Sequence, residues 1–355
     1  MKKLLFVINN LGVGGAERQI VDDALAFSKK GYQVTFLTLR NEFEKSIIQE
    51  IQGAEIQIKK IVFKNIFDIS AHRTFIHWLQ QEQFAVIISH LWFANTIVRL
   101  AGIVVRKQKI MCFEQNVYDN LKTWKMFLID RILQYYCYKI FAVSSTVKDS
   151  LIRHGIQSQR IEVLHNSVDL DKYQKAEKMI ISNVPADAFK FLFVGRLIYQ
   201  KAVDILLQAF AQVPKGVLLI AGQGSDRESL EQLAQKLGVA DRVFFLGVIS
   251  NIPNLMKSCD VFILPSRYEG LALVAVEAMA TPLPIIISDF PATADIITHE
   301  QEGIIVPREN ISELTNACIK LLNDAELRNY LKNNAFEKVK HFSLDRHTTI
   351  LESYF

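Results

Sequence analysis

The stretch VFILPSRYEGLALVAVEAMA, residues 261–280, joins a buried strand to the helix that follows it. Its first four residues are apolar and Pro265 and Ser266 end the run, which is typical of a buried parallel strand. Residues 271–280 lack Gly and Pro and are rich in Ala, Leu, Glu and Met, so a helix is predicted to begin at about Gly270. Because the free N–H groups of a helix N-terminus bind anions, the stretch predicts a phosphate site at the carboxyl edge of a parallel sheet.

Two glutamates flank this predicted phosphate site. Glu269 lies at the mouth of the helix, and Glu277 lies two turns in, on the face of Gly270 and about 10 Å along the axis at about 1.5 Å per residue. Carboxylates accept hydrogen bonds from paired hydroxyls but repel phosphate, so this pair fits a diphosphate that carries sugar at both ends, such as a nucleotide-sugar. A loop Glu and a Glu on a solvated helix face are the alternative that these residues leave open.

The frame from Glu269 to Glu277 resembles the signature of glycosyltransferase family 4, retaining enzymes of the GT-B fold. Further segments resemble the family in the same order: NNLGVGGAER (9–18), HNSVDLDKY (165–173), FVGRLIYQKAVDILLQAF (193–210), AGQGSDRESLEQLAQKLGVADRVFFLG (221–247) and QEGIIVP (301–307). The resemblance spans nearly the whole chain. It implies an α/β protein of two Rossmann-like domains that face each other across a cleft.

The resemblance also implies the domain limits. Residues 1–170 would form the N-terminal, acceptor-side domain, and residues 171–340 the C-terminal domain that binds the nucleotide-sugar. The last helix, within residues 341–355, would pack back on the first domain. A chain of 355 residues is too long for one compact core and has the length of two such domains.

The composition indicates a cytoplasmic protein. No uninterrupted apolar run reaches the length of about 18 residues that a spanning helix needs. The start MKKLLFVINN is interpreted as a first strand, because no small-residue cleavage site of a signal peptide follows it. The four cysteines are scattered singly, which favours reduced thiols in a cytosol and argues against a zinc site.

Positive charge is concentrated in the first half of the chain. Residues 1–170 hold 22 Lys and Arg against 15 Asp and Glu, a net +7, and the remainder holds 19 against 22, a net −3. This asymmetry favours an anionic partner such as lipid phosphates or nucleic acid. Because no nucleic-acid recognition motif is present, we expect an anionic membrane surface and no nucleic acid.

Residues 121–139, LKTWKMFLIDRILQYYCYK, form the most amphipathic stretch, and two interpretations stay open. A basic and aromatic helix can lie in a membrane interface, which would bring the enzyme to the inner face of the cell membrane. Alternatively, the helix buries its apolar stripe against the sheet and exposes a basic back. The apolar residues are Trp124, Phe127, Leu128, Ile132 and Tyr135, and the basic ones are Lys122, Lys125, Arg131 and Lys139.

The first half reads as an open parallel sheet, with strands predicted at residues 3–9, 32–39, 85–89, 110–113, 140–143 and 162–164. Gly14 and Gly15 form a turn that lets the backbone approach a ligand, and the resemblance places this turn near the donor diphosphate and the transferred sugar. His90, Gln115 and Asn116 follow strand ends and are candidate sugar or acceptor contacts. Many family members carry a His where this chain has Gln115 and Asn116, and His90 is equally compatible with an ordinary strand-end histidine.

In the second half, Gly195 and Arg196 leave a strand predicted at residues 190–194, and Lys201 opens the next helix. A guanidinium and an ammonium group facing a phosphate site would neutralise a diphosphate, whereas isolated residues of these types could be surface charges. In the pattern G-R-x-x-x-x-K they match the family's diphosphate-binding pair, with Ala202 where Gly is usual. The resemblance implies catalytic roles for Arg196, Lys201 and Glu269, and donor contacts from Gly14, Gly15, Gly195, Gly222, Gly224, Gly270, Leu271, Ala272, Leu273 and Glu277.

Asp169 and Asp171 look like a D-x-D metal motif, but their surroundings match the hinge segment of family 4, whose members generally need no metal. We therefore expect no metal and no cofactor. The predicted activity is retaining transfer of a hexose or N-acetylhexosamine from a UDP-sugar to a lipid-linked saccharide, lipopolysaccharide or polysaccharide acceptor. A sugar-nucleotide epimerase or a phosphorylase of the same fold, and a basic nucleic-acid-binding module, are the alternatives.

Overall fold

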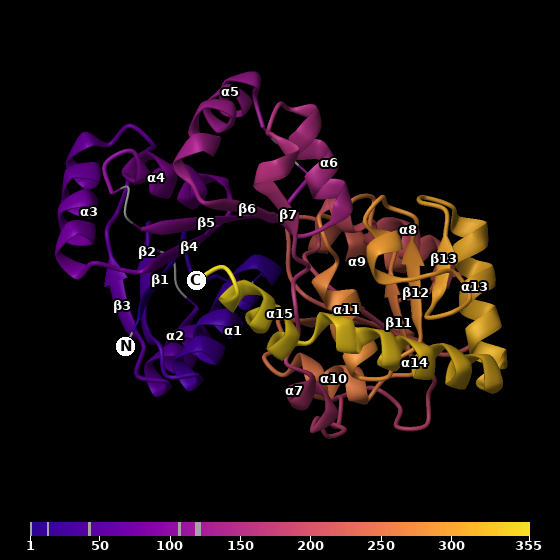
Figure 1. The fold of residues 1–355 in the computed structure, drawn as a ribbon. Coiled ribbons are helices and arrows are strands. Elements are labelled where there is room, and N and C mark those ends of the chain that lie inside the picture. The colour runs from indigo at the N-terminus through magenta and orange to yellow at the C-terminus, as the bar shows by residue number, and fades with distance from the viewer. Residues whose placement is uncertain (1, 13, 42–43, 106–107, 118–121) are drawn as a thin grey trace. The chain divides into compact units, whose positions relative to one another are not determined.

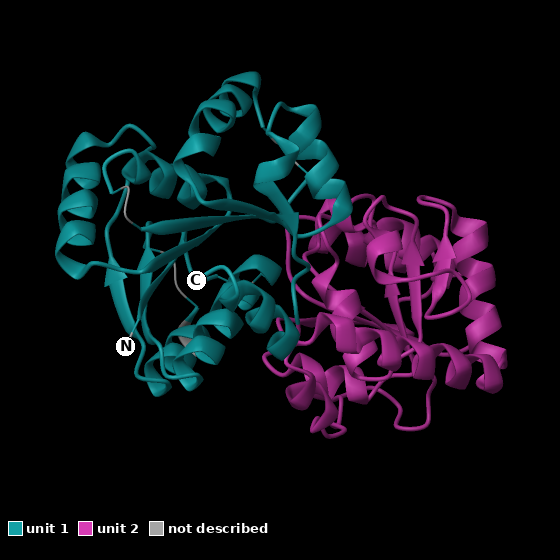
Figure 2. Cartoon of the chain, in the orientation of Figure 1, with its two compact units in different colours: residues 1–167, 344–355 teal, residues 168–343 magenta. Residues whose placement is uncertain are grey.

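The structure is a computed structural model that describes residues 2–12, 14–41, 44–105, 108–117 and 122–355. Val13 of the glycine-rich turn and Leu121 of the amphipathic stretch lie outside these residues. The chain divides into two compact units (Figure 2): unit 1 comprises Met1–Ser167 and Leu344–Phe355, and unit 2 comprises Val168–Ser343. The sequence analysis placed these limits after residue 170 and at residue 341. Each unit is built on a parallel sheet, so the predicted class of two Rossmann-like α/β domains is confirmed.

Unit 1 contains a seven-stranded parallel sheet with the strand order β3-β2-β1-β4-β5-β6-β7. Its central strands read as continuous apolar runs because helices cover both faces of the sheet. The strand bounds are β1 (Lys3–Ile8), β2 (Gln33–Thr38), β3 (Gln57–Lys60), β4 (Val86–His90), β5 (Lys109–Glu114), β6 (Lys139–Ala142) and β7 (Ile161–Val163).

Helices lie on both sides of this sheet (Figure 1), with α1, α2 and α15 on one side and α4 and α5 on the other. The last helix packs on the first, where Lys30 and Tyr32 bind the Glu352 carboxylate at 2.9 and 2.7 Å. The helix bounds are α1 (Gly15–Lys29), α2 (Lys45–Gly53), α3 (Ile69–Glu82), α4 (Trp92–Gly102), α5 (Trp124–Leu133), α6 (Ser145–Arg153) and α15 (Leu344–Glu352), with short 3-10 turns at Gln134–Tyr136 and Ser158–Arg160.

Unit 2 contains a six-stranded parallel sheet with the order β10-β9-β8-β11-β12-β13. Its strands are β8 (Lys190–Val194), β9 (Val217–Ala221), β10 (Val243–Gly247), β11 (Val261–Leu264), β12 (Ile285–Ser288) and β13 (Ile304–Val306). Its helices are α7 (Leu170–Gln174), α8 (Val203–Phe210), α9 (Arg227–Lys236), α10 (Ile252–Lys257), α11 (Leu273–Ala280), α12 (Thr293–Ile296), α13 (Ile311–Asn323) and α14 (Ala325–Val339), with 3-10 turns η3 (Tyr199–Lys201) and η4 (Lys340–Phe342).

The strand order reverses once in each sheet, between β1 and β4 in unit 1 and between β8 and β11 in unit 2. In open parallel sheets, ligands bind outside the carboxyl ends of the strands at such a reversal. The glycine-rich turn follows β1 and His90 ends β4. Gly195, Arg196 and Lys201 follow β8, and Glu269 follows β11. In each sheet, residues predicted to form the site therefore end or follow the two strands at which the strand order reverses.

Candidate functional site

The centre of the candidate site in unit 2 is an ion pair between Lys201 and Glu269. Lys201 ends the 3-10 turn η3 after β8, and its Nζ lies 2.6 Å from Glu269 Oε1. The buried Ser266 hydroxyl donates to the same carboxylate oxygen at 2.7 Å, and Gln200 Nε2 donates to the other oxygen at 3.3 Å. The carboxylate is thus held by three side chains, and the carboxyl ends of β8 and β11 are joined at the strand-order reversal.

Arg196, the second predicted cation, is placed differently. Its side chain is exposed, and within the described part of the chain its guanidinium has no hydrogen-bond or ion-pair partner. An exposed guanidinium keeps all of its donors available for an anion. Of the two predicted diphosphate-binding residues, Arg196 is therefore available as it stands, whereas Lys201 is shared with a carboxylate.

The helix after β11 starts later than predicted. Helix α11 begins at Leu273, and Ala272 is its N-cap with φ −78° and ψ 77°. The predicted start at Gly270 is wrong because residues 270–272 precede the helix. The separation of about 10 Å between Glu269 and Glu277, which assumed one continuous helix, therefore does not follow. Glu277 is half-buried and lies beyond the first turn.

Three of the N–H groups at this helix end are still available to a ligand. Gly270, Leu271, Ala272 and Leu273, all named as donor contacts, are buried at the entrance to α11. The N–H groups of Leu271, Ala272 and Val274 find no backbone acceptor in the described ranges. Such groups at a helix N-terminus bind anions.

Gly222 and Gly224 permit a close backbone contact between two loops. A Cβ on Gly222, whose φ is +140°, would lie 1.9 Å from the Gly195 carbonyl oxygen, and a Cβ on Gly224 would lie 2.1 Å from the Leu197 carbonyl oxygen. The two loops are also hydrogen-bonded, since Leu197 N donates to Gln223 O at 2.9 Å. The predicted nucleotide-bordering loop thus packs directly on the loop that carries Arg196.

Ala202 occupies a backbone position that favours glycine. It caps α8 with φ 51° and ψ 39°, in the left-handed region, and is fully buried. This conformation costs an L-residue with a Cβ about 1–2 kcal/mol. It explains why glycine is the usual residue here in the resembling pattern, and it leaves the neighbouring Lys201 in place.

In unit 1, His90 and Gln115 lie together at the carboxyl ends of β4 and β5. Gln115 Nε2 lies 3.0 Å from His90 Nδ1, and the Gln115 amide exchanges two hydrogen bonds with the Asn166 amide, at 2.7 and 3.2 Å. His90 stacks on Phe113 at 4.5 Å, and its Nε2 is buried without a hydrogen-bond partner among the described residues. Burial lowers the pKa of His90 to about 3, so the ring is neutral at neutral pH. Asn116 is half-buried next to this group.

A second polar cluster, which the sequence analysis missed, joins α1 to Ser167 and α15. Gln19 and Asp23 of α1 are fully buried, and Gln19 binds Asp23 and Ser167 at 2.8 and 2.9 Å. His347 of α15 lies 3.4 Å from Asp23; burial lowers its pKa, but the Asp23 carboxylate outweighs this, so the pKa is raised overall. Gln19 and Asp23 stand at a four-residue spacing beside Ile20 and Ala24, and polar residues on an apolar helix stripe were the available signal.

Gly14 and Gly15 begin α1 at this end of the sheet. Gly14 is the N-cap in an extended conformation, and its carbonyl accepts from Arg18 N at 2.9 Å. A Cβ on Gly14 would lie 2.3 Å from the end of the Glu17 side chain, which is flexible, so this glycine is required less strictly than Gly222. Gly15 is exposed.

The start of the amphipathic stretch contradicts the expectation that its basic residues form a solvated back. Lys122 is not part of a basic back, because its ammonium group is buried and binds Asp130 at 2.8 Å and Glu114 at 3.5 Å. Asp130 also binds the buried Arg99 at 2.6 Å. The buried carboxylates of Glu114 and Asp130 are compensated by two buried cations, Arg99 and Lys122. Burial of Lys122 follows from this pairing.

The apolar stripe of α5 points to solvent. Trp124, Leu128, Ile132 and Tyr135 are between 47% and 70% exposed, and Phe127 stacks on His154 at 3.6 Å. The interpretation that this stripe packs against the sheet is therefore wrong, because α5 buries Asp130 and Leu133 instead. No helix within the described ranges has the length and apolar character to cross a bilayer.

The D-x-D pair has structural partners. Asp169 caps α7 by accepting from Lys172 N at 3.3 Å, and Asp171 pairs with Lys175 at 2.9 Å. Each carboxylate thus supports the short helix α7 at the start of unit 2.

Several residues around the Lys201–Glu269 pair were not predicted. The sequence analysis treats Ser266 only as the end of a strand. Its spacing of three residues before Glu269 was the available signal for a hydrogen bond to that carboxylate. Tyr199, Gln200 and Arg267 are joined around η3, where the Arg267 guanidinium lies 4.0 Å from the Tyr199 ring centroid and Arg267 N donates to Gln200 O at 2.8 Å. These contacts link residues some 68 positions apart, for which a single sequence carries no spacing signal.

Comparison with known proteins finds two family models that match the chain in succession. The model described as Glycosyltransferase Family 4 matches residues 13–172, and the model described as Glycosyl transferases group 1 matches residues 174–338. The first covers the candidate residues of unit 1 from Gly14 onward, and the second covers those of unit 2.

The chain is also similar to individual proteins over most of its length. It is 26% identical to a Campylobacter jejuni α-1,4-N-acetyl-D-galactosaminyltransferase acting on an undecaprenol-linked saccharide, over 97% of this chain and 95% of that one. It is 26% identical to the Escherichia coli UDP-Gal:α-D-GlcNAc-diphosphoundecaprenol α-1,3-galactosyltransferase, over 75% and 73%. The crystal structure of Anabaena HepE with UDP matches at 19% identity over 99% of both chains with a TM-score of 0.87, which shows the same fold.

Proposed function

Because the chain belongs to glycosyltransferase family 4, we propose that it transfers a hexose or N-acetylhexosamine, with retention, from a UDP-sugar to a lipid-linked saccharide or a lipopolysaccharide or polysaccharide acceptor. The activities of two relatives support this class of acceptor, since both act on saccharides linked to undecaprenol. UDP as the carrier is supported by the donor of the Escherichia coli relative and by the UDP in the HepE structure.

The observation that carries the proposal is the arrangement at the β8 and β11 strand ends. A free guanidinium, an ammonium group and a helix N-terminus gather there beside a carboxylate that Lys201, Ser266 and Gln200 hold in place. Cations and N–H dipoles stabilise the charge that develops on a departing diphosphate. A fixed carboxylate binds sugar hydroxyls and stabilises positive character at the sugar.

The proposed function assigns a binding role to each residue of the site. Arg196, Lys201 and the N-terminus of α11 bind the diphosphate, and Glu277 binds the ribose hydroxyls. Glu269 binds the hydroxyls of the transferred sugar. The loop at Gly222 and Gly224 borders the nucleotide. We propose that the departing phosphate takes the proton of the acceptor hydroxyl on the same face of the sugar, and that neither a metal ion nor a cofactor takes part.

Thermal shift against UDP-, GDP- and ADP-sugars, followed by product analysis with the preferred donor, tests this function. We expect a UDP-sugar to raise the melting temperature most and the product to keep the anomeric configuration of the donor. Conversion of the donor into another nucleotide-sugar would identify an epimerase instead, and phosphate-dependent cleavage of a saccharide would identify a phosphorylase.

We further propose that the enzyme acts in the cytoplasm and binds the inner face of the cell membrane through α5. The support is the exposed stripe of Trp124, Leu128, Ile132 and Tyr135 together with the exposed cations Lys125 and Arg131. Aromatic and aliphatic side chains with flanking cations insert into the interface of an anionic bilayer, and each cation near the surface contributes about 1 kcal/mol. Binding there would bring the enzyme to a lipid-linked acceptor.

Co-sedimentation with vesicles that contain phosphatidylglycerol tests the membrane proposal. We expect Trp124→Ser, Leu128→Ser and Ile132→Ser together to abolish pelleting, and Lys125→Glu with Arg131→Glu to weaken it most at low salt. The matched control changes three exposed apolar residues elsewhere in unit 1: Val62, Phe67 and Ile69. Equal pelleting of the α5 variant and this control would contradict docking through α5, and pelleting with RNA but not with lipid would favour a nucleic-acid partner.

A further inference from the structure

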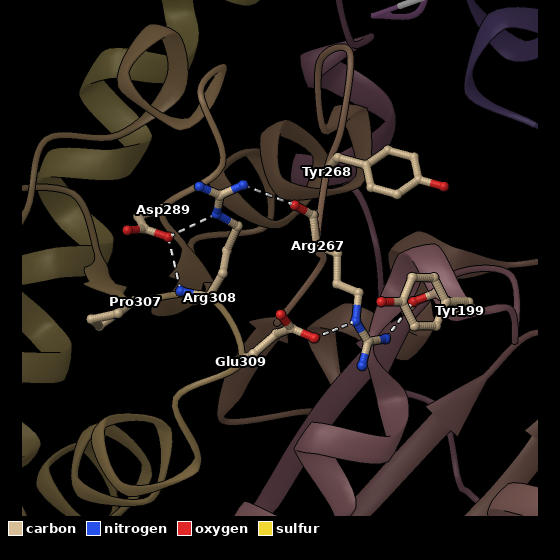
Figure 3. A pocket seen from close by; sticks show the side chains of 7 residues that line it. All are labelled: Tyr199, Arg267, Tyr268, Asp289, Pro307, Arg308 and Glu309. Carbon is tan, nitrogen blue, oxygen red and sulfur yellow. Dashed lines mark hydrogen bonds and ion pairs between the residues drawn. The ribbon is translucent and has the colours of Figure 1, made fainter. Parts of the chain in front are cut away.

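An open pocket of about 500 Å³ lies in unit 2 at the carboxyl edge of its sheet (Figure 3). Its residues come from the ends of four neighbouring strands: the loop after β8, the loop after β11, the end of β12 and the loop after β13. It is lined by Tyr199, Arg267, Tyr268, Asp289, Pro307, Arg308 and Glu309. None of these residues has a role in the binding of the donor proposed above.

Two phenol rings border the pocket. Tyr199 and Tyr268 are 65% and 43% exposed, so both rings are open to solvent. The Arg267 guanidinium covers one side of Tyr199 at 4.0 Å, which holds the ring in place. Figure 3 shows both rings on the same side of the pocket. A fixed ring with an open face and a hydroxyl edge suits a ligand that has an apolar face and a polar rim, as a pyranose does.

The charges of the pocket cancel and are already paired. Arg267 binds both oxygens of Asp204, at 3.1 and 2.8 Å, and binds Glu309 at 2.8 Å. Asp289 Oδ1 accepts from the Arg308 backbone N and Nε, at 2.8 and 3.2 Å. Two guanidinium groups and two carboxylates in the lining leave no net charge for an anion. Paired groups can still donate to and accept from hydroxyls at their free edges, so the pocket favours a neutral polyhydroxyl ligand.

The pocket is joined to the candidate reaction centre through Gln200. The Gln200 side-chain amide donates to the Tyr268 backbone oxygen at 2.8 Å and to Glu269 Oε2 at 3.3 Å. The Gln200 backbone oxygen accepts from Arg267 N at 2.8 Å. A sugar in the pocket would therefore lie close to the carboxylate that is proposed to bind the transferred sugar.

We propose that this pocket is a subsite for a neutral pyranose of the acceptor saccharide, distinct from the transferred sugar. This inference rests on the proposed function for the identity of the acceptor, but binding of a sugar can be measured without turnover. Stacking of the acceptor sugar on Tyr199 and Tyr268 would then determine which saccharides the enzyme extends. The donor would bind separately, through Arg196 and Lys201.

Saturation-transfer NMR on the whole protein with UDP present tests the subsite. The probes are methyl α-galactoside, methyl α-mannoside and methyl N-acetyl-α-glucosaminide at millimolar concentration. We expect at least one probe to receive saturation from wild type, and its signal to fall about 3- to 10-fold in Tyr199→Ala and in Tyr268→Ala. Tyr330→Ala is the matched control, because Tyr330 is as exposed as these residues but lies on α14 outside the pocket.

A second measurement separates this inference from the proposed function. The thermal shift by UDP and by UDP-sugar should be the same in wild type and in all three variants, and only the KM for the saccharide acceptor should rise in the two pocket variants. Absence of saturation transfer to every probe, equal signals in all variants, displacement by inorganic pyrophosphate, or a weaker UDP-sugar shift in the pocket variants would overturn the subsite. A wild type that binds a probe but shows no UDP shift would contradict the proposed function and leave the subsite standing.

Discussion

Replacing Lys201 with Met would break the ion pair at the centre of the candidate site. The Nζ–Oε1 separation is 2.6 Å, and the two side chains are 13% and 8% exposed. At this separation the Coulomb attraction is about 6 kcal/mol for an effective dielectric constant of about 20, before the cost of desolvation. Removing one partner of a buried pair costs about 3 to 5 kcal/mol, because the other charge stays uncompensated. Since some solvent reaches this pair, we expect Lys201→Met to lower the free energy of unfolding by about 3 kcal/mol.

Urea unfolding of wild type, Lys201→Met, Glu269→Gln and the double variant measures this cost. The double variant removes both charges with little change of shape, so we expect it to recover about 2 kcal/mol of the loss seen in Lys201→Met. Arg196→Ala is the control, because Arg196 is exposed and its guanidinium has no described partner; the free energy of unfolding should change by less than about 0.5 kcal/mol.

Loss of either cation, Arg196 or Lys201, should lower the turnover of the enzyme. Arg196→Ala and Lys201→Ala should each lower turnover by about 100-fold or more, because removing a preorganised charge from a developing anion costs about 2.7 to 4 kcal/mol. Wild-type stability of Lys201→Met, or losses of the two single variants that simply add in the double variant, would contradict a stabilising ion pair between Lys201 and Glu269. Near-normal turnover in both alanine variants would remove the diphosphate assignment.

Three other changes have defined outcomes. EDTA should leave activity almost unchanged, and a strict requirement for a divalent ion in a metal-depleted assay would return attention to Asp169 and Asp171. Gly222→Ala should destabilise the protein by at least about 2 kcal/mol in urea, since its Cβ would lie 1.9 Å from the Gly195 oxygen at φ +140°, whereas Gly53→Ala, with open space around Gly53, should be nearly neutral. The pKa of His90 is lowered to about 3, so below its unfolded value of 6.5 the unfolded state binds a proton that the folded state does not. Wild type should therefore lose up to about 1.4 kcal/mol per pH unit between pH 6.5 and 3 relative to His90→Asn, and parallel pH profiles would contradict this.

The positions of the site residues along the chain were predictable because parallel strands place their carboxyl ends at one edge. Gly195, Arg196 and Lys201 follow a recognisable apolar strand, and Glu269 follows another. Once two such strands are neighbours, residues far apart in sequence must meet at their ends. The structure bears this out for Lys201 and Glu269, which are in contact. It does so in unit 1 for His90 and Gln115, whose side chains lie 3.0 Å apart.

Other features were not predictable from local pattern. Helix α11 begins at Leu273, because the chain after Glu269 first passes through a non-helical segment that propensity does not reveal. Lys122 appeared to be one of several basic residues on an amphipathic helix, but Glu114 and Asp130 hold it inside. The Gln19, Asp23 and His347 cluster joins the first helix to the last, across a separation over which a single sequence carries no pairing information.

Sequence pattern alone was enough to predict parallel α/β sheets and the strand ends at which the candidate residues stand, although it did not predict strand β3 (Gln57–Lys60). Those properties follow from hydrophobic periodicity and chain connectivity, which are local and additive along the chain. The pairing of charges, the face of α5 that meets solvent, and the two tyrosines that border a pocket next to Glu269 became visible in the folded structure. The physical reason is that a charge or an apolar surface is stabilised by whatever lies opposite it, and in this chain the opposite partner usually comes from a distant strand or helix.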